Sequence, residues 1–547
     1  MGSDLDVSRL RARQEMAKSD QYVLSIDLGT SGCKVGLVST TGHVVAWAFR
    51  SVPLQVIDTI GAEQDPSQWW NAFIEASQDV LSQSAVLRQN IVAICSSTQG
   101  EGTVAVDRDG NVLMNAIIWL DMRGARYLKK EMRGAMKVAG YDAIKLQKWL
   151  RLCGGAPALS GKDPAGHMLL IRDAFPDIYE KTYKFLNVLD FFNLRLTGRF
   201  CATQDSILTS WVTDNRDVNH IRYDDGLIGA SGIDKAKFPD LVRCTDIVGT
   251  LLPSVADLLG LSPKTPVVAG AIDNSAAAIG AGTLADYDAH LYMGSSSWIS
   301  AHVPFKKTSV MDQITSVPCP VPSKYLMIAM QSSGASNIAF LKDRIVFHDD
   351  GLIDSEPTPD TYRLLDEIAA RTPAGAAGMM YLPWLFGERC PVDDPTLRAG
   401  IFNMSMEHNR ETLVRAVFEG VALNTRWMMK PVSRFLGRRP EAITMIGGGA
   451  MSPAWCQIFA DVLGVQIRQP HDPMKANARG AAFIGAVGLG LLQFDDVARH
   501  VVIDRIYEPD PATQRLYDER FGIFTELHRR LAPLYKRLNG SKGKIHG

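Results

Sequence analysis

The chain has 547 residues, of which 46 % are hydrophobic and 21 % charged, and its formal net charge is −1. A single hydrophobic core rarely exceeds about 250–300 residues, so this length predicts two domains. The near-neutral charge argues against nucleic acid or an anionic membrane surface as the partner. The eight cysteines form no C-x-x-C pair. That spacing argues against a disulfide framework or a zinc site and favours reduced thiols, as in a cytoplasmic enzyme.

The chain begins with a charged segment. Residues 1–20 contain no apolar core of the kind found in a signal peptide, so we expect an N-terminal extension before the fold begins at Gln21. No uninterrupted apolar run is long enough to span a bilayer, because the small-residue run near Val267 is broken by Asp273.

The first predicted elements are short strands joined by tight turns. Residues 22–27, 34–39 and 43–50 are typical of strands, with turn residues at Leu28–Gly32 and at Thr41-Gly42. This pattern predicts a β-meander and argues against the strand-then-helix unit of a dinucleotide-binding domain. Further along we expect a helix over 64–82, strands over 91–96 and 103–107, polar helices within 125–183, a helix over 188–197, a strand over 265–270 and a helix over 275–280.

The strand–turn–strand pattern returns in the second half of the chain, over residues 290–302. We place a domain boundary near Thr283, giving domains over 21–283 and 284–547. The other elements expected in the second domain are a strand over 325–330, helices over 411–429, 453–463, 476–488 and 511–538, and a strand over 442–446 that ends in a triple-glycine turn.

Two of the turns carry residues suited to binding phosphate. In Asp27-Leu28-Gly29-Thr30-Ser31 a glycine lets the backbone approach a ligand, the two hydroxyls can donate, and the aspartate can hold Mg²⁺ through water. Gly294-Ser295-Ser296 offers a similar cradle without an aspartate. Each could equally be an ordinary turn. Together they suit a nucleotide triphosphate held between two lobes.

Asp273 follows a predicted buried strand and precedes a helix of small residues. A carboxylate at this place can accept the proton of an attacking hydroxyl. The alternative is a helix N-cap, a common position for aspartate. The two roles are compatible.

Two further groups are candidates for ligand binding. Gly448, Gly449 and Ala450 lie between a strand and a helix, where bare backbone suits a flat adenine ring; the alternative is a flexible connection. Polar side chains near Trp119 suit a polyhydroxylated ligand, although surface ion pairs are their usual fate. This second group consists of Gln99, Glu101, Asp121 and Arg123.

The motifs of several other enzyme classes are missing from the sequence. It has no Walker A motif, no G-x-G-x-x-G after a strand, no H-E-x-x-H and no G-x-S-x-G. P-loop phosphotransfer, dinucleotide binding, zincin and α/β-hydrolase chemistry therefore have no support.

Several blocks in one order resemble the FGGY family of carbohydrate kinases. The resemblance covers about Gln21 to Leu491. Its blocks are Ile26–Ser31, Trp119–Arg123, Arg195–Gly198, Ile272–Asn274, Gly294–Ser296, Leu382–Pro391, Phe402–Glu419 and Gly447–Trp455.

The resemblance implies an α/β fold of two ribonuclease H-like lobes, as in actin-like ATPases, with a central cleft between them. It also implies ATP and Mg²⁺, with Asp273 as the general base and Asp27 orienting the metal. Gly29, Thr30, Ser31, Gly294, Ser295 and Ser296 would contact phosphates, and Gly448, Gly449 and Ala450 would line the adenine site. Gln99, Glu101, Asp121, Arg123 and Asn274 would surround the sugar.

The sequence departs from the family pattern at several positions. His167 lies where lysine is usual, Asn403 and Thr412 replace usual residues of the second signature, and Ala271-Ile272 replace glycines before Asp273. These changes affect lobe packing and substrate assignment more than phosphate chemistry.

The substrate is indicated by the loop Gln99-Gly100-Glu101-Gly102, which lies where xylulokinases have Q-M-H-G and glycerol kinases have Q-R-E. We expect a pentulose such as xylulose, or a C4–C5 sugar alcohol, with glycerol as the alternative. Two other classes stay open at this point: a chaperone- or actin-type ATPase, and a non-catalytic sugar sensor. We also expect a cytoplasmic protein that binds no nucleic acid or membrane, with a homodimer as an assembly to test.

Overall fold

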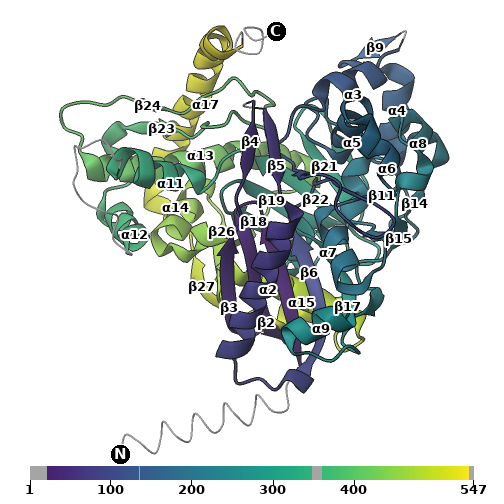
Figure 1. Cartoon of the computed structure of the whole chain (residues 1–547). Helices are drawn as coiled ribbons and strands as arrows, with labels where there is room; N and C mark the ends of the chain where they lie inside the picture. Colours follow the sequence, from purple (N-terminus) through teal and green to yellow (C-terminus); the bar gives the residue numbers. More distant parts are fainter. Residues whose placement is uncertain (1–20, 59, 135, 348–359, 541–547) are drawn as a thin grey trace, which may run out of the picture.

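The computed structural model describes residues 21–58, 60–134, 136–347 and 360–540 (Figure 1). The extension predicted over residues 1–20 lies outside this range. Two mixed sheets with helices on their faces dominate the described residues. No helix among them has the length and apolar character needed to cross a membrane.

The first sheet contains the predicted meander. Its strands, in spatial order, are β16 (Ile247–Thr250), β17 (Pro266–Ile272), β6 (Ile91–Thr98), β1 (Tyr22–Gly29), β2 (Gly32–Ser39) and β3 (Val44–Ser51). The last three pair antiparallel, whereas β6 lies parallel to both β1 and β17.

The second sheet repeats this arrangement. Its strands, in spatial order, are β20 (Thr308–Ser309), β21 (Ile314–Pro318), β22 (Tyr325–Gln331), β19 (Ser297–Val303), β18 (Ala289–Met293), β25 (Ala442–Ile446), β26 (Gln466–Pro470) and β27 (Ile503–Tyr507). Again a three-stranded antiparallel meander, β18–β19–β22, is extended by parallel strands, β25 and β26. The weak internal repeat in the sequence is therefore a repeat of topology.

Helices cover the sheets and form the outer parts of both lobes. In the first half they are α2 (Pro66–Gln83), α3 (Ala125–Glu131), α4 (Ala143–Leu152), α5 (Pro164–Ala174), α6 (Pro176–Lys181), α7 (Val188–Thr197), α8 (Asp225–Ser231), α9 (Pro253–Leu259) and α10 (Asp273–Gly280). In the second half they are α11 (Ser336–Phe340), α12 (Thr361–Arg371), α13 (Arg410–Leu436), α14 (Pro453–Leu463), α15 (Ala476–Gly488), α16 (Phe494–His500) and α17 (Pro511–Asn539).

Short strands complete the fold outside the two large sheets. They are β4 (Gln55–Ile57), β5 (Gly61–Gln64), β7 (Val104–Val106), β8 (Ala116–Ile117), β9 (Lys137–Val138), β10 (Tyr141–Asp142), β11 (Lys184–Leu186), β12 (Cys201–Thr203), β13 (Thr213–Asp214), β14 (Arg222–Tyr223), β15 (Asp240–Val242), β23 (Met380–Leu382) and β24 (Gly400–Phe402).

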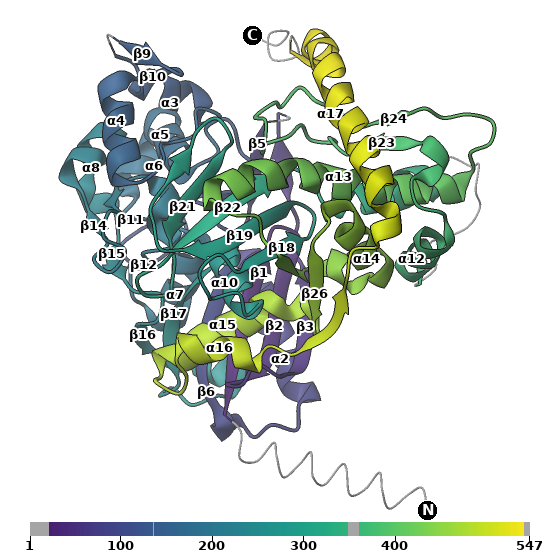
Figure 2. The ribbon, with the colours of Figure 1, turned by 180° about the vertical axis from the view of Figure 1, so that it is seen from behind.

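The two lobes meet where α10 and α15 cross, as the view from behind shows (Figure 2). The helices touch backbone to backbone. A Cβ on Gly280 would lie 1.8 Å from the carbonyl oxygen of Ala476, and one on Gly480 would lie 1.9 Å from that of Ala276. Only glycine permits this approach. Buried residues of α15 share one apolar cluster with Val23 and other residues of the first sheet.

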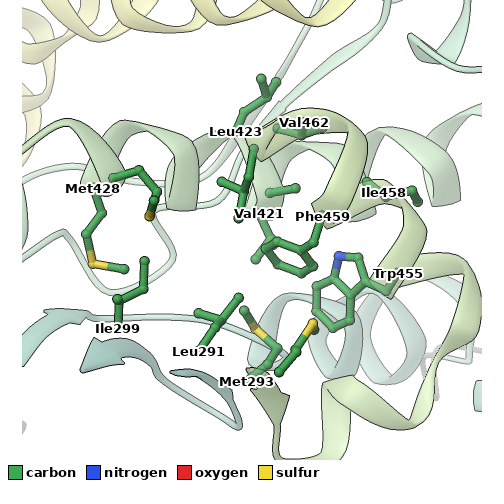
Figure 3. Packing of buried hydrophobic residues seen from close by; sticks show 14 of the residues in the cluster. Leu291, Met293, Ile299, Val421, Leu423, Met428, Trp455, Ile458, Phe459 and Val462 are labelled. Atoms are coloured by element: carbon green, nitrogen blue, oxygen red, sulfur yellow. The ribbon is translucent and has the colours of Figure 1, made fainter. Parts of the chain in front are cut away.

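The core of the second lobe fixes the strand that leads to a predicted phosphate bend. Met293, the last residue of β18, lies beside Trp455 of α14 in the cluster that also contains Leu291 and Phe459 (Figure 3). A buried strand end of this kind holds the following turn in place.

Two predicted boundaries are wrong in an informative way. The helix expected over 411–429 continues to Leu436 through Pro431, because Val432, Phe435 and Leu436 are buried and their packing outweighs the backbone hydrogen bond that proline removes. The helix expected over 275–280 begins at Asp273, and Ile272 rather than Asp273 occupies the N-cap position.

Candidate active site

The first bend is closed by an ion pair that the sequence analysis did not single out. Asp27 on β1 and Lys34 on β2 are cross-strand partners, so both side chains lie on the same face of the sheet. Lys34 Nζ lies 3.0 Å from Asp27 Oδ2, and Asp27 is 3 % exposed. Burial alone would lower the pKa of Lys34, but the charge of Asp27, the nearby Tyr292 and the hydrogen bond to Asp27 together outweigh burial, so the pKa is raised. The register of the hairpin is the signal that could have identified Lys34.

Asp273 stands at the junction of β17 and α10, half-buried, and its Oδ1 accepts a hydrogen bond from the Asn274 backbone N–H at 2.8 Å. Burial, reinforced by the negative charge of Asp27, raises the pKa of Asp273 to about 7. A carboxylate poised near neutrality suits a general base. The buried Nδ2 of Asn274 has no hydrogen-bond partner among the described residues, so it is available to a ligand.

Tyr292, two residues before the second bend Gly294–Ser296, lies close to the same charged groups from the other lobe. Tyr292 stacks on Trp298 with ring centroids 3.9 Å apart, and a Cβ on Gly294 would lie 2.8 Å from the tyrosine hydroxyl. Burial raises the pKa of Tyr292, and the charges of Lys34, Asp27 and Asp273 are close enough to act on it. The structure therefore brings both bends and Asp273 to one place between the lobes.

The glycine turn after β25 is packed against the end of β18. Gly447 has φ = +90°, and a Cβ there would lie 2.8 Å from the carbonyl oxygen of Met293. Gly449 and Ala450 are buried, whereas Gly448 is exposed and a Cβ on it would meet nothing within 4 Å. Of the three residues predicted for adenine, Gly448 is thus the one that presents bare backbone to open space.

Thr30 connects the first bend to the predicted substrate loop. Its hydroxyl accepts a hydrogen bond from Trp119 Nε1 at 2.8 Å and donates one to Gln99 Oε1 at 2.9 Å. Gln99 in turn donates to Gln64 Oε1 at 2.8 Å, and Gln64 donates to the Thr30 carbonyl oxygen at 2.9 Å. This closed network fixes Gln99 beside the bend. Gln64 is a member that the sequence did not reveal.

Asp121 and Arg123 lie in an internal ion-pair network. Asp121 is fully buried and accepts from the Ala62 backbone N–H at 2.9 Å, and Arg123 donates to Asp121 at 2.9 Å and to Glu63 at 2.6 Å. These contacts fix β5 to the loop after β8. The contact of both residues with substrate stays a prediction.

Glu101 lies within range of two cations from different parts of the fold. It has φ = +60°, and burial raises its pKa while Arg389 and Lys162 oppose that shift. Burial and the neighbouring Arg389 lower the pKa of Lys162. None of the three makes an ion pair within 4 Å among the described residues. Glu101 also raises the pKa of Asp273, so this group borders the same crevice.

The carboxylates fit a magnesium site of the usual kind. Magnesium commonly keeps several waters and binds one or two carboxylates together with substrate phosphates. Asp27 Oδ1 has no hydrogen bond within the described part of the chain, and Asp273 supplies a second carboxylate nearby. Among the described residues, no group of three or more Asp, Glu, His or Cys side chains is arranged to hold a metal ion without help from a ligand.

Comparison with known proteins identifies the two halves of the chain. The N-terminal domain model of the FGGY family of carbohydrate kinases matches residues 22–280, and the C-terminal domain model matches 291–489. The chain is 29 % identical over 510 residues to a xylulose kinase of Bacillus subtilis (strain 168), covering 93 % of this chain and 97 % of that protein. It is 27 % identical over 522 residues to a xylulose kinase of Escherichia coli (strain K12), covering 93 % and 99 %.

A solved structure matches over nearly the whole molecule. The crystal structure of gluconate kinase from Lactobacillus acidophilus superposes with a TM-score of 0.79 at 23 % identity, covering 95 % of this chain and 100 % of that one. This likeness confirms the predicted two-lobed, actin-like α/β fold. The two domain models, which together match more than half of the chain, show that it belongs to the FGGY family of carbohydrate kinases.

Proposed function

We propose that this kinase transfers the terminal phosphoryl group of ATP to a hydroxyl of a pentulose, with D-xylulose as the first candidate. The observation that carries the proposal is the meeting of Asp27, Lys34 and Asp273 from one lobe with Tyr292 and the second bend from the other. Family membership favours a carbohydrate kinase over the chaperone- or actin-type ATPase and the non-catalytic sugar sensor.

In this proposal Asp273 accepts the proton of the attacking hydroxyl, and Lys34 with the backbone of Gly29–Ser31 and Gly294–Ser296 contacts the phosphates. Asp27 would hold Mg²⁺, which when bound neutralises phosphate charge. Gly448, with Gly449 and Ala450 beside it, forms the wall for adenine. Positioning and charge stabilisation are the main sources of rate in such a reaction.

Gln99, Glu101 and Asn274 are the proposed contacts of the sugar, together with Asp121 and Arg123 as predicted from the sequence. We add Lys162 and Arg389, because neither has an ion-pair partner within 4 Å among the described residues and both act on Glu101. A polyol between these three groups would satisfy them, since carboxylates accept from hydroxyls and cations donate to them.

The two cations beside Glu101 favour a second candidate, D-gluconate, whose carboxylate they could bind. Glycerol is the third, because Glu101 stands where glycerol kinases have glutamate. The cytoplasm remains the proposed location, since all eight cysteines are free thiols. A homodimer remains the assembly to test.

The deciding experiment measures ATP consumption with D-xylulose, D-gluconate and glycerol, each with the wild type and with Asp273→Asn. We expect the highest kcat/KM with D-xylulose, and a loss of about 10²–10⁴-fold in kcat for Asp273→Asn with ADP affinity unchanged. A higher kcat/KM with D-gluconate would make D-gluconate the assigned substrate. Normal turnover in Asp273→Asn would refute the assignment of Asp273 as the general base.

A further inference from the structure

Asp205 is a buried carboxyl that fixes the chain on both sides of Asp273. It lies after β12 and is 1 % exposed. Its Oδ2 accepts a hydrogen bond from the backbone N–H of Ile272 at 2.8 Å, and its Oδ1 accepts one from the hydroxyl of Ser275 at 2.9 Å. The residue between these two anchors that faces the charged crevice is Asp273.

The backbone leading to Asp273 is irregular. Strand β17 shifts its register with β6 between Val268 and Ala271, where Gly270 has φ = +80°, and pairing with β6 resumes at Ala271 and Ile272. Helix α10 starts at Asp273, where the first N–H groups of a helix have no intrahelical acceptor. The side chain of Asp205 therefore joins the last residue of an irregular strand to the first turn of the helix.

Burial raises the pKa of Asp205 to about 7. The negative charge of Asp190 also raises the pKa of Asp205, but Asp190 makes its own hydrogen bonds, accepting from the Ser206 hydroxyl and the Asn187 backbone N–H. Both carboxyl oxygens of Asp205 therefore accept hydrogen bonds from the segment that carries Asp273.

We propose that Asp205 is a positioning residue for phosphoryl transfer, which holds Ile272 and Ser275 so that the carboxylate of Asp273 keeps its orientation toward the cleft. This inference rests on the proposed role of Asp273 as the base. Its basis is geometric, since displacing a reacting group by about 1 Å can cost on the order of a hundredfold in rate.

The test uses Asp205→Ala, Asp205→Asn and Ser275→Ala, assayed with ATP and D-xylulose, or with D-gluconate if the wild type prefers it. We expect Asp205→Ala to lower kcat by about a hundredfold, with KM for ATP within threefold of the wild type. Asp205→Asn should restore most of the activity, because its amide can accept from Ile272 and donate to Ser275 Oγ. Ser275→Ala should fall between the two.

The chain supplies a matched control in Asp461 of α14. Its Oδ1 also accepts one backbone N–H, from Asp510 at 2.9 Å, and one side-chain donor, from Gln457 at 2.8 Å. Asp461→Ala removes the same kinds of bond in the other lobe and should lower the melting temperature without lowering kcat. Equal kcat values for Asp205→Ala and Asp461→Ala would overturn the proposal.

A double variant separates positioning from general destabilisation. In the Asp273→Asn background, Asp205→Ala should lower kcat less than twofold further, because Asp205 acts only through Asp273. Additive losses would overturn the proposal.

The remaining variants keep the proposal testable if Asp205→Ala does not fold. In that case, wild-type activity in both Asp205→Asn and Ser275→Ala would overturn it. Full activity in Asp273→Asn would refute both the base assignment and this inference. Full activity in Asp205→Ala, together with an inactive Asp273→Asn, would refute this inference and leave the base assignment intact.

Discussion

At the scale of single residues, the protonation of the candidate site depends on three neighbouring charged groups, Asp27, Lys34 and Asp273. Asp27 forms an ion pair with Lys34, and Asp273 lies close enough to Asp27 to be affected by its negative charge. The pKa of Asp273 is therefore raised, mainly by burial and then by Asp27. A base with this environment changes its protonation state near neutral pH.

The first prediction is a pH dependence. Asp273 can accept a proton only when it is ionised, so kcat/KM for D-xylulose should rise with pH, about tenfold per unit below pH 7, and level off above it. Initial rates at saturating ATP from pH 5.5 to 9 would measure this limb. A rate independent of pH between 6 and 8 would contradict the assignment.

The second prediction concerns Lys34, whose positive charge lowers the pKa of Asp273. Lys34→Met removes that charge, so the acid limb of kcat/KM should move to higher pH, and kcat should fall because the proposed contact of Lys34 with phosphate is lost. The same rate measurements test it. Lys129→Met, on an exposed part of α3, is the control that should leave the profile unchanged. A limb that moves to lower pH would show that Lys34 does not act on Asp273.

At the scale of secondary-structure elements, the crossing of α10 and α15 depends on two glycines. The third prediction is that Gly480→Ala lowers the stability by about 1–3 kcal/mol, because the new Cβ would lie 1.9 Å from the carbonyl oxygen of Ala276. Thermal unfolding measures the effect. Gly229→Ala on α8 is the control: a Cβ there meets nothing within 4 Å, so this substitution should be neutral or slightly stabilising.

The elements also show where sequence reasoning succeeds. Helix α14 was predicted with both ends correct, because Pro453 marks its first turn and Gly464 its end. Helix α15 and strand β25 were predicted equally well. Helix α13 extends to Leu436, beyond the end predicted at Met429, because the burial of Phe435 and Leu436 is a tertiary property that the local pattern does not contain.

The same limit applies to the candidate site. Asp27, Asp273 and the two bends could be predicted because each lies near or just after the end of a strand, next to turn-forming residues. Lys34 required the hairpin register, since its partner is seven residues away in the sequence. Lys162 and Arg389 come from different lobes, and only the folded chain brings them to Glu101.

At the scale of the whole molecule, residues from both sides of the boundary predicted near Thr283 pack into a common hydrophobic cluster. Helix α15 of the second half lies against β1, β6 and β17 of the first sheet. Its buried residues belong to one cluster with Val23 and Cys95. The two halves therefore complete each other.

The fourth prediction is that residues 21–283 alone will not form a native fold, because the face of the first sheet that α15 covers would be exposed to water. Near-ultraviolet circular dichroism and hydrogen exchange of the isolated fragment would measure this. Adding residues 284–547 in trans should restore the signals. A fragment that folds cooperatively by itself would show that the boundary also separates two cores.

The hairpin that pairs Asp27 with Lys34 also limits how the chain can change. Between Gly29 and Gly32 only Thr30 and Ser31 form the turn, and every pair behind them is in register. An inserted residue that shifted this register by one would exchange the two faces of β2, so that Lys34 would point away from Asp27 and Val35 would take its place. We therefore expect this loop to tolerate replaced residues but not inserted ones, because its length decides which face of β2 carries Lys34.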